Sequence, residues 1–186
     1  FVAGKNMASE PMSAQVFKTI ADTYIGRLNM FRLFTGNLKA DSVVYNSAKE
    51  KEEKIAQILI MTGKEQAGVP ELHAGDIGAV AKLSVTGTGD TLCTKANSVV
   101  LDAIQFPQPT LSVAIEPKSK GDEDKLSGAV QRILEEDPTV RLEKNSETKQ
   151  TILTAMGDTH IDYIIEKLTR KYGVDVVMRE MRIPYR

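Results

Sequence analysis

The feature that most constrains the fold is a change of hydrophobic period along this chain of 186 residues. Up to about residue 104, apolar residues form short, mostly alternating runs, and Gly, Asn and Asp separate these runs. Beyond that point, runs with a helical period of about 3.6 residues are interspersed with alternating ones. The sequence FPQP at 106–109 lies between the two regions, and its prolines favour extended backbone. We therefore predict two domains, 1–104 and 110–186, joined by a linker at 105–109.

The first region predicts an all-β domain. Its runs are rich in Val, Ile, Thr, Phe and Tyr, and no amphipathic helix of ordinary length interrupts them. Short strands with regular turn signals are typical of an antiparallel β-barrel or sandwich. The charged run KEKEEK at 49–54 is predicted to be the solvated end of a hairpin. The expected strands cover 14–21, 27–34, 42–46, 54–61 and 78–85.

The second region predicts an α+β domain with the order β-α-β-β-α-β. This is the ferredoxin-like arrangement, in which two helices cover one face of a four-stranded antiparallel sheet. Each expected helix places its apolar residues on one face, the first within 121–138 and the second within 158–173. Pro138 ends the first helix, and Gly173 has the position of a C′ residue after the second. The expected strands cover 111–117, 139–144, 149–156 and 174–183.

The glycine-rich run SVTGTGDTLC at 84–93 raises the question of a phosphate site. A P-loop requires G-x-x-x-x-G-K-[ST], and neither Gly4-Lys5 nor Gly63-Lys64 is followed by Ser or Thr. In the dinucleotide pattern G-x-G-x-x-G, the third glycine is replaced here by Leu92. The run therefore predicts a turn of the barrel and no nucleotide site.

Charge and cysteine content restrict the partners and the compartment. The net charge is -1, so the total charge favours neither nucleic acid nor an anionic membrane, although a local basic face remains open. Cys93 is the single cysteine and cannot form a disulfide within the chain, which favours a reducing compartment. No apolar run approaches the ~20 residues of a membrane helix. We expect a cytoplasmic protein with no membrane partner.

Basic residues give one candidate contact surface. Arg27 and Arg32 lie in one predicted strand with aromatic residues, and Lys39 follows soon after. In a barrel, these three cations are candidates for contacts with RNA phosphates. The alternative is ordinary surface charge.

His160 is the other candidate, because it stands between acidic residues at the start of the second predicted helix. Metal binding would need further ligands at helical spacing, and none is present. We expect Asp158 or Thr159 to be the N-cap residue, with Asp162 completing an approximate capping box. A role for His160 and Asp158 at an interface is the alternative. No arrangement of residues predicts catalysis or a metal.

Several long segments resemble domains II and III of bacterial elongation factor G. They are VFKTIADTYIGRLNMFRLFTGNL, GDIGAVAKL, TGDTLC, FPQPTLSVAIEPKSKGDEDKLSGAVQRILEEDPTVRL and QTILTAMGDTHIDYIIEKLTRKYGVDV. The resemblance covers nearly the whole chain and implies a translation-protein β-barrel followed by a ferredoxin-like domain. It also implies that GTP and magnesium are held by a separate domain of the parent protein. This chain would then be no enzyme and would hold no cofactor. Phe1 in place of Met and Arg186 directly after a strand-like run also suggest a piece of a longer protein.

The resemblance implies a mechanical role in translation. Domain II of the family rests on small-subunit rRNA, and domain III lies between the GTPase domain and the later domains, near a small-subunit protein. The segment with Asp158 and His160 corresponds to a family segment that lies toward other domains. Family members typically carry Glu and Leu before this histidine, whereas this chain carries Asp158 and Thr159. A paralogue that acts in ribosome recycling or protection is therefore one alternative to the translocase, and a stand-alone RNA-binding module is another.

Overall fold

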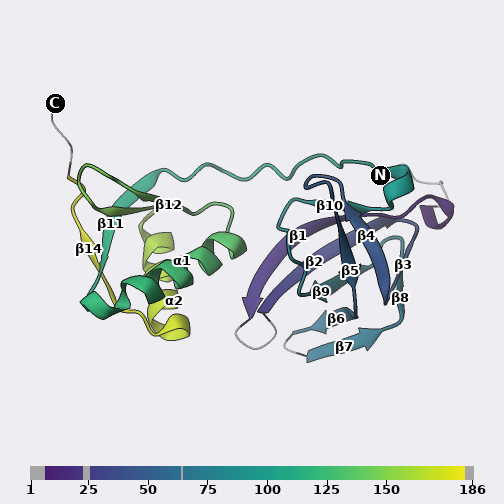
Figure 1. Cartoon of the computed structure of the whole chain (residues 1–186), viewed down its shortest axis with the longest axis horizontal. Coiled ribbons are helices and arrows are strands. Elements are labelled where there is room, and N and C mark those ends of the chain that lie inside the picture. Colours follow the sequence, from purple (N-terminus) through teal and green to yellow (C-terminus); the bar gives the residue numbers. More distant parts are fainter. Residues whose placement is uncertain (1–6, 23–25, 64, 183–186) are drawn as a thin grey trace. The chain divides into compact units, whose positions relative to one another are not determined.

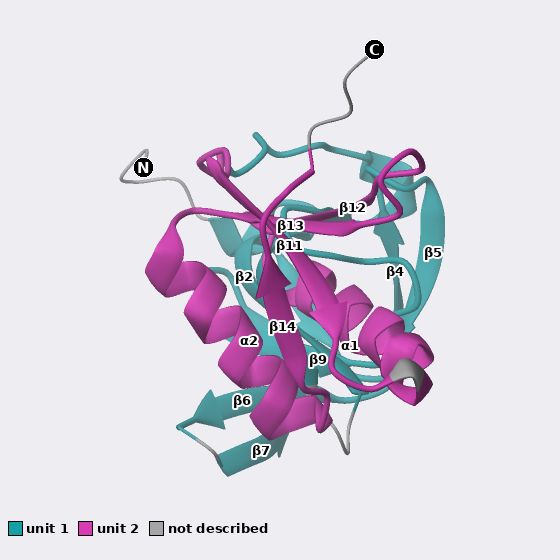
Figure 2. Cartoon of the chain, turned by 90° about the vertical axis from the view of Figure 1, so that its left-hand side faces the viewer, with its two compact units in different colours: residues 1–104 teal, residues 105–186 magenta. Residues whose placement is uncertain are grey.

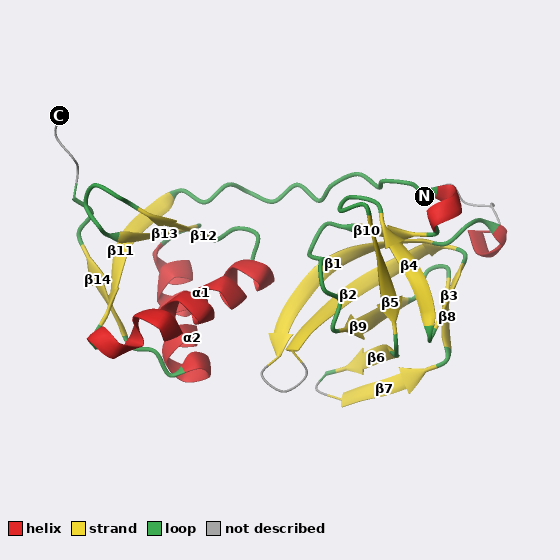
Figure 3. Cartoon of the chain, in the orientation of Figure 1, coloured by secondary structure: helices red, strands yellow, loops and turns green. Residues whose placement is uncertain are grey.

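The computed structural model describes residues 7–22, 26–63 and 65–182. The chain divides into two compact units, Phe1–Ile104 and Gln105–Arg186, so the predicted linker 105–109 falls at the start of the second unit (Figure 2). Residues 98–110 contain neither helix nor strand (Figure 3). Each unit has its own hydrophobic core.

Unit 1 is built on one antiparallel sheet with the strand order β5-β4-β10-β1-β2-β9-β6-β7 (Figure 1). The sheet curls into a half-barrel, and β3 and β8 form a separate two-stranded pair. Fully buried Phe31, Leu33, Ile55, Ile58 and Leu92 lie in the core that the sheet encloses. The prediction of an antiparallel barrel is confirmed. The elements of unit 1 are η1 (Met7–Ser9), β1 (Ser13–Asp22), β2 (Gly26–Thr35), β3 (Asn37–Lys39), β4 (Ser42–Asn46), β5 (Lys51–Ile55), β6 (Ile58–Thr62), β7 (Glu65–Val69), β8 (Glu71–His73), β9 (Ile77–Ala81), β10 (Thr91–Cys93) and η2 (Lys95–Asn97).

The β1–β2 hairpin is the centre of this sheet. Side chains alternate along β2, so Phe31 and Leu33 are fully buried while Phe34 is 36% exposed. The register shifts between Val16 and Lys18 of β1, which leaves Phe17 as the additional residue of a β-bulge. Phe17 and Lys18 are both exposed, whereas Val16 before the bulge and Thr19 after it are buried.

The predicted strand at 54–61 is wrong, because two strands occupy this stretch. β5 pairs with β4, whereas β6 pairs with β7 and β9, so the chain changes its place in the sheet after Ile55. The charged run 49–54 is also not simply a solvated hairpin end, because Lys51–Lys54 belong to β5. Alternation along β5 turns Glu53 and Ile55 inward, and Glu53 is only 6% exposed.

The buried carboxylate of Glu53 binds the loop between β9 and β10. Val85 N–H donates to it at 2.9 Å and Thr86 N–H at 3.2 Å. Ser84 N–H, Ser84 Oγ and Thr86 Oγ1 donate as well. The glycine-rich run therefore holds an anion, but the anion comes from the chain itself.

The same loop contains the predicted turn, at Thr88-Gly89. Gly89 has φ +94°, a left-handed conformation that glycine adopts readily. Asp90 accepts hydrogen bonds from Gly87 N–H at 3.0 Å and from Asn46 Nδ2 at 3.0 Å. The turn does not close a hairpin, because β9 pairs with β2 and β6 while β10 pairs with β1 and β4.

Unit 2 has the sheet order β12-β13-β11-β14, with antiparallel neighbours throughout, and both helices cover the same face (Figure 2). The predicted ferredoxin-like domain is confirmed. The helices bury the predicted face, including Leu126, Ile133, Ile164 and Leu168, and Gly173 ends α2 in the left-handed conformation. The elements are β11 (Leu111–Pro117), η3 (Lys120–Asp122), α1 (Glu123–Glu136), β12 (Arg141–Lys144), β13 (Thr151–Ala155), α2 (Asp158–Tyr172) and β14 (Val176–Arg179).

An ion cluster joins the two helices. The Glu136 carboxylate at the end of α1 accepts from Lys167 Nζ and, at 3.1 Å, from Lys171 Nζ of α2. The Glu136 side chain is 9% exposed, and those of Lys167 and Lys171 are 19% and 28% exposed. Burial by itself lowers the pKa of Lys167, but the hydrogen bond and charge of Glu136 raise it above its ordinary value.

Glu53→Gln should destabilise unit 1 by about 2 kcal/mol at pH 7, because charge-assisted hydrogen bonds are lost. Burial alone raises the pKa of Glu53, but the hydrogen bonds from Thr86, Val85 and Ser84 set this pKa below its ordinary value of 4.5. The wild type therefore holds this stabilisation at neutral pH and loses it as the pH falls below about 4.5 through the folded pKa. Urea unfolding of wild type and variant, followed by NMR signals of unit 1, should show a difference that shrinks in acid. If the difference in unfolding free energy between wild type and Glu53→Gln were the same at pH 7 and pH 3, the assignment of an ionised, hydrogen-bonded Glu53 carboxylate would be contradicted.

Glu136→Gln should destabilise unit 2 by about 2 kcal/mol, because two neighbouring ammonium groups lose their carboxylate. The pKa of Lys167 is raised in the folded state. The stabilisation of unit 2 by the Glu136 ion pairs is therefore complete at neutral pH and declines only above the ordinary lysine pKa of 10.5. The control is Glu166→Gln, which removes an ion pair whose Arg170 and Glu166 side chains are 80% and 53% exposed. That variant should stay within about 0.5 kcal/mol of wild type in the same urea titration. Equal effects of the two variants would refute the inter-helix role of Glu136.

Candidate functional site

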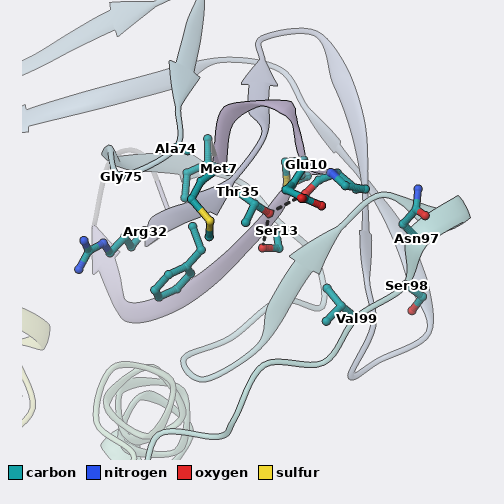
Figure 4. Close-up of a pocket in the computed structure, with 14 residues that line it drawn as sticks. Met7, Glu10, Ser13, Arg32, Thr35, Ala74, Gly75, Asn97, Ser98 and Val99 are labelled. Atoms are coloured by element: carbon teal, nitrogen blue, oxygen red, sulfur yellow. Dashed lines mark hydrogen bonds between the residues drawn. The ribbon is translucent and has the colours of Figure 1, made fainter. Parts of the chain in front are cut away.

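Unit 1 contains a cavity with a volume of about 840 Å³ (Figure 4). It is formed by η1, the end of β2, the turn between β8 and β9, and the segment after η2. Most of its wall is apolar, and Glu10 and Arg32 are the ionisable residues among the described ones that line it. The lining residues are Met7, Glu10, Pro11, Met12, Ser13, Arg32, Leu33, Phe34, Thr35, Ala74, Gly75, Asn97, Ser98 and Val99.

Backbone geometry fixes one wall of this cavity. Gly36 has φ +69°, and a Cβ there would lie 2.8 Å from backbone atoms of Glu10 and Met12. Only glycine lets the segment before β1 approach so closely. Thr35 Oγ1 donates to Pro11 O at 2.6 Å and is 2.7 Å from Ser13 Oγ, as the dashed lines of Figure 4 mark. The cavity wall is therefore built by glycine geometry and hydroxyl hydrogen bonds.

A second cavity of about 270 Å³ adjoins the first on the outer face of the sheet. Arg32 and Phe34 line both, and Gln15, Phe17 and Ile77 complete the second. The Arg32 guanidinium carbon lies 5.6 Å from the centroid of the Phe34 ring, within the range of a cation–π interaction. Phe17 is 37% exposed and Ile77 is 53% exposed. We call the two cavities together the outer groove.

The outer groove combines a cation with exposed aromatic and aliphatic surface. Such a combination suits a ligand that has planar rings and negative charge, as single-stranded nucleic acid does. The arrangement therefore fits binding.

The three predicted basic residues do not meet in one place. Arg32 lies in the outer groove. Arg27 points to the opposite face of β2, because it lies an odd number of positions (five) before Arg32 along the strand. Its Nη1 donates long hydrogen bonds to Ser84 O at 3.4 Å and Thr86 O at 3.5 Å. Lys39 is exposed in β3 and lines neither cavity. A ribosome contact for any of them stays a prediction.

His160 links the two helices of unit 2. Its Nε2 lies 3.0 Å from Asp137 Oδ2, directly after α1, and Met156 N–H donates to its Nδ1 at 3.3 Å. An accepting Nδ1 assigns the proton of the neutral ring to Nε2, which then donates to Asp137. This contact lies within the unit, and an additional contact of His160 with another domain stays a prediction.

The predicted cap of α2 is wrong. Gly157 is the N-cap residue, and no side chain makes a cap hydrogen bond. Asp158 is the first helical residue, and both it and Thr159 are exposed. The predicted cap fails because the helix begins one residue earlier: Gly157 O already accepts from Ile161 N–H at 3.0 Å, so Asp158 lies inside the first turn.

Sequence reasoning missed Met7, Gln15, Phe17 and Ile77 of the outer groove. The bulge that exposes Phe17 depends on strand register, which has no local signal here. Among residues 7–22, 26–63 and 65–182, no three His, Cys, Asp or Glu side chains gather as a metal site. The described helices are also too short or too polar to cross a membrane.

Comparison with known proteins agrees with both units. A family model described as elongation factor G domain 2 matches residues 11–95, and one described as elongation factor G, domain III, matches residues 106–180. A crystal structure of a protein from Thermus thermophilus is similar, with a TM-score of 0.85 and 31% sequence identity. The match covers 97% of this chain and 27% of that one. The chain therefore belongs to the elongation factor G family and consists of the family's domains II and III.

Proposed function

We propose that this chain is the ribosome-binding, conformation-coupling segment of a translational GTPase of the elongation factor G type. The observation that carries the proposal is the succession of the two family domains over residues 11–95 and 106–180. In this proposal the parent protein drives translocation on the ribosome with GTP and magnesium, which a separate domain holds. The neighbours of the segment are small-subunit rRNA and protein, the GTPase domain and the later domains, in the cytoplasm.

The outer groove supports rRNA contact by unit 1. Arg32 offers charge to a phosphate, while Phe34 and Phe17 offer faces on which a base can stack. Arg27 and Lys39 contribute long-range positive charge at most, because they lie outside the outer groove. Arg32 and Phe34 are therefore the residues on which binding should depend most.

The separate cores support mechanical coupling. Leu101 N–H donates to Thr91 Oγ1, and Asp102 O accepts from Gln15 Nε2, which fastens one end of the connecting segment to unit 1. Thr110 N–H donates to Ala155 O and fastens the other end to unit 2. Two rigid modules fastened at both ends of a short connection can transmit a displacement as rigid bodies.

Replacing both Arg32 and Phe34 by Ala should weaken binding of the chain to isolated small ribosomal subunits about tenfold, since a cation and a stacking surface are lost. Arg32→Ala alone should reduce the slope of log affinity against log salt by about one. Lys54→Ala, an exposed lysine of β5, is the matched control and should bind as wild type. The affinity for small ribosomal subunits is measured by co-sedimentation over a salt series for the wild type, the double variant, Arg32→Ala and Lys54→Ala. Unchanged binding by the double variant would overturn the role of the outer groove, and equally tight binding to unrelated single-stranded RNA would favour a stand-alone RNA-binding module.

The chain alone should show no GTP binding by calorimetry, because the glycine-rich loop already holds the Glu53 carboxylate. The parent protein with its preceding domain should bind GTP in the same buffer with magnesium. Micromolar affinity of the isolated chain would contradict the placement of the nucleotide in another domain.

A further inference from the structure

The loop after β9 has the chemistry of an anion site. Three successive backbone N–H groups, of Ser84, Val85 and Thr86, and the hydroxyls of Ser84 and Thr86 donate to one carboxylate. Successive N–H groups aimed at one point are the means by which backbone loops bind phosphate and carboxylate ligands. Here the acceptor is Glu53, which reaches the loop from β5.

We propose that residues 84–86 form a preformed oxyanion site of carboxylate specificity and that Glu53 is its resident ligand. The loop keeps its shape through contacts that do not involve Glu53. Gly89 N–H donates to Val16 O at 2.7 Å, and Val16 N–H donates to Asp90 O at 2.9 Å. Asp90 also accepts from Gly87 N–H at 3.0 Å. At the donors themselves, Asn29 Nδ2 donates to Thr86 O at 3.2 Å and Asn46 Nδ2 donates to Thr86 Oγ1 at 2.9 Å. We therefore expect the site to keep its shape when the Glu53 side chain is removed.

Burial of the donors of Thr86 favours an anionic acceptor in this site. Thr86 is fully buried and Glu53 is 6% exposed, whereas Val85 is half-buried and Ser84 is exposed, so the two Thr86 donors have the least access to bulk water. Buried donors without an acceptor are strongly unfavourable. A small oxyanion that enters the vacated space should therefore bind and stabilise unit 1.

The side chain itself defines the ligand that fits. Glu53→Ala removes a CH₂ and a carboxylate, which together have the heavy atoms of acetate. Propionate has one more methylene than this space and should fit less well. Acetate is thus the probe that restores the missing atoms, and it is ionised at pH 7.

Glu53→Ala should bind acetate saturably at pH 7, with sodium chloride matching the ionic strength. The amide signals of Ser84, Val85 and Thr86 should shift in the NMR spectrum of the labelled chain. At acetate ten times above its dissociation constant, the folding equilibrium constant of unit 1 should rise about 11-fold. Propionate should bind more weakly.

Three controls isolate the site. In the wild type, the Glu53 carboxylate occupies the site, and in Glu53→Gln an amide occupies it. Glu52→Ala removes an exposed neighbouring carboxylate that pairs with Lys95. None of the three should respond to acetate beyond the chloride baseline. Absence of a saturable response in Glu53→Ala, or an equal response in Glu53→Gln, would overturn the proposal. If Glu53→Ala does not fold, hydrogen exchange of the 84–86 amides in Glu53→Gln decides: faster exchange than wild type supports the site, and unchanged exchange overturns it.

Discussion

The carboxylate of Glu53 closes a barrel that backbone pairing leaves open. In the sheet order, β5 stands at one end, while β9 lies on the far side of the central β1–β2 hairpin. Glu53 on β5 reaches Val85 and Thr86 in the loop that leaves β9, so a side chain joins the edge strand to the opposite part of the sheet. Because Thr86 is fully buried and several groups donate to one carboxylate, an ionised acceptor stabilises the closure more than a neutral side chain of similar size. This contact reinforces the curvature of unit 1, and the buried core around Phe31 and Leu33 defines the inside and outside of β2.

The outer groove follows from that curvature. With the core on the concave side, alternation along β2 assigns Phe31 and Leu33 to the interior and Arg32 and Phe34 to the outer face. The bulge in β1 adds Phe17 beside them. A basic and aromatic surface thus arises on strands whose other face contributes Phe31 and Leu33 to the core.

Unit 2 is held by a different kind of contact. Its two helices share an apolar face against the sheet, and polar groups at their ends fix their pairing. Glu136 forms ion pairs with Lys167 and Lys171, and His160 forms a hydrogen bond with Asp137. Since these contacts lie within the unit, it can move as one body in the coupling role proposed for the chain.

The amino-acid sequence by itself determined the two fold classes, the order of elements in unit 2 and the family resemblance. Hydrophobic period, proline and glycine act locally, so Leu126 through Ile133 or Gly173 can be interpreted without knowledge of distant residues. Only the tertiary structure decided the role of Glu53, the outer groove around Arg32, and the partner of His160. These depend on strand register and on residues 23 or more positions apart in the chain, such as His160 and Asp137. A charged run looks solvated in sequence because local chemistry cannot show that a distant loop supplies buried donors to one of its carboxylates.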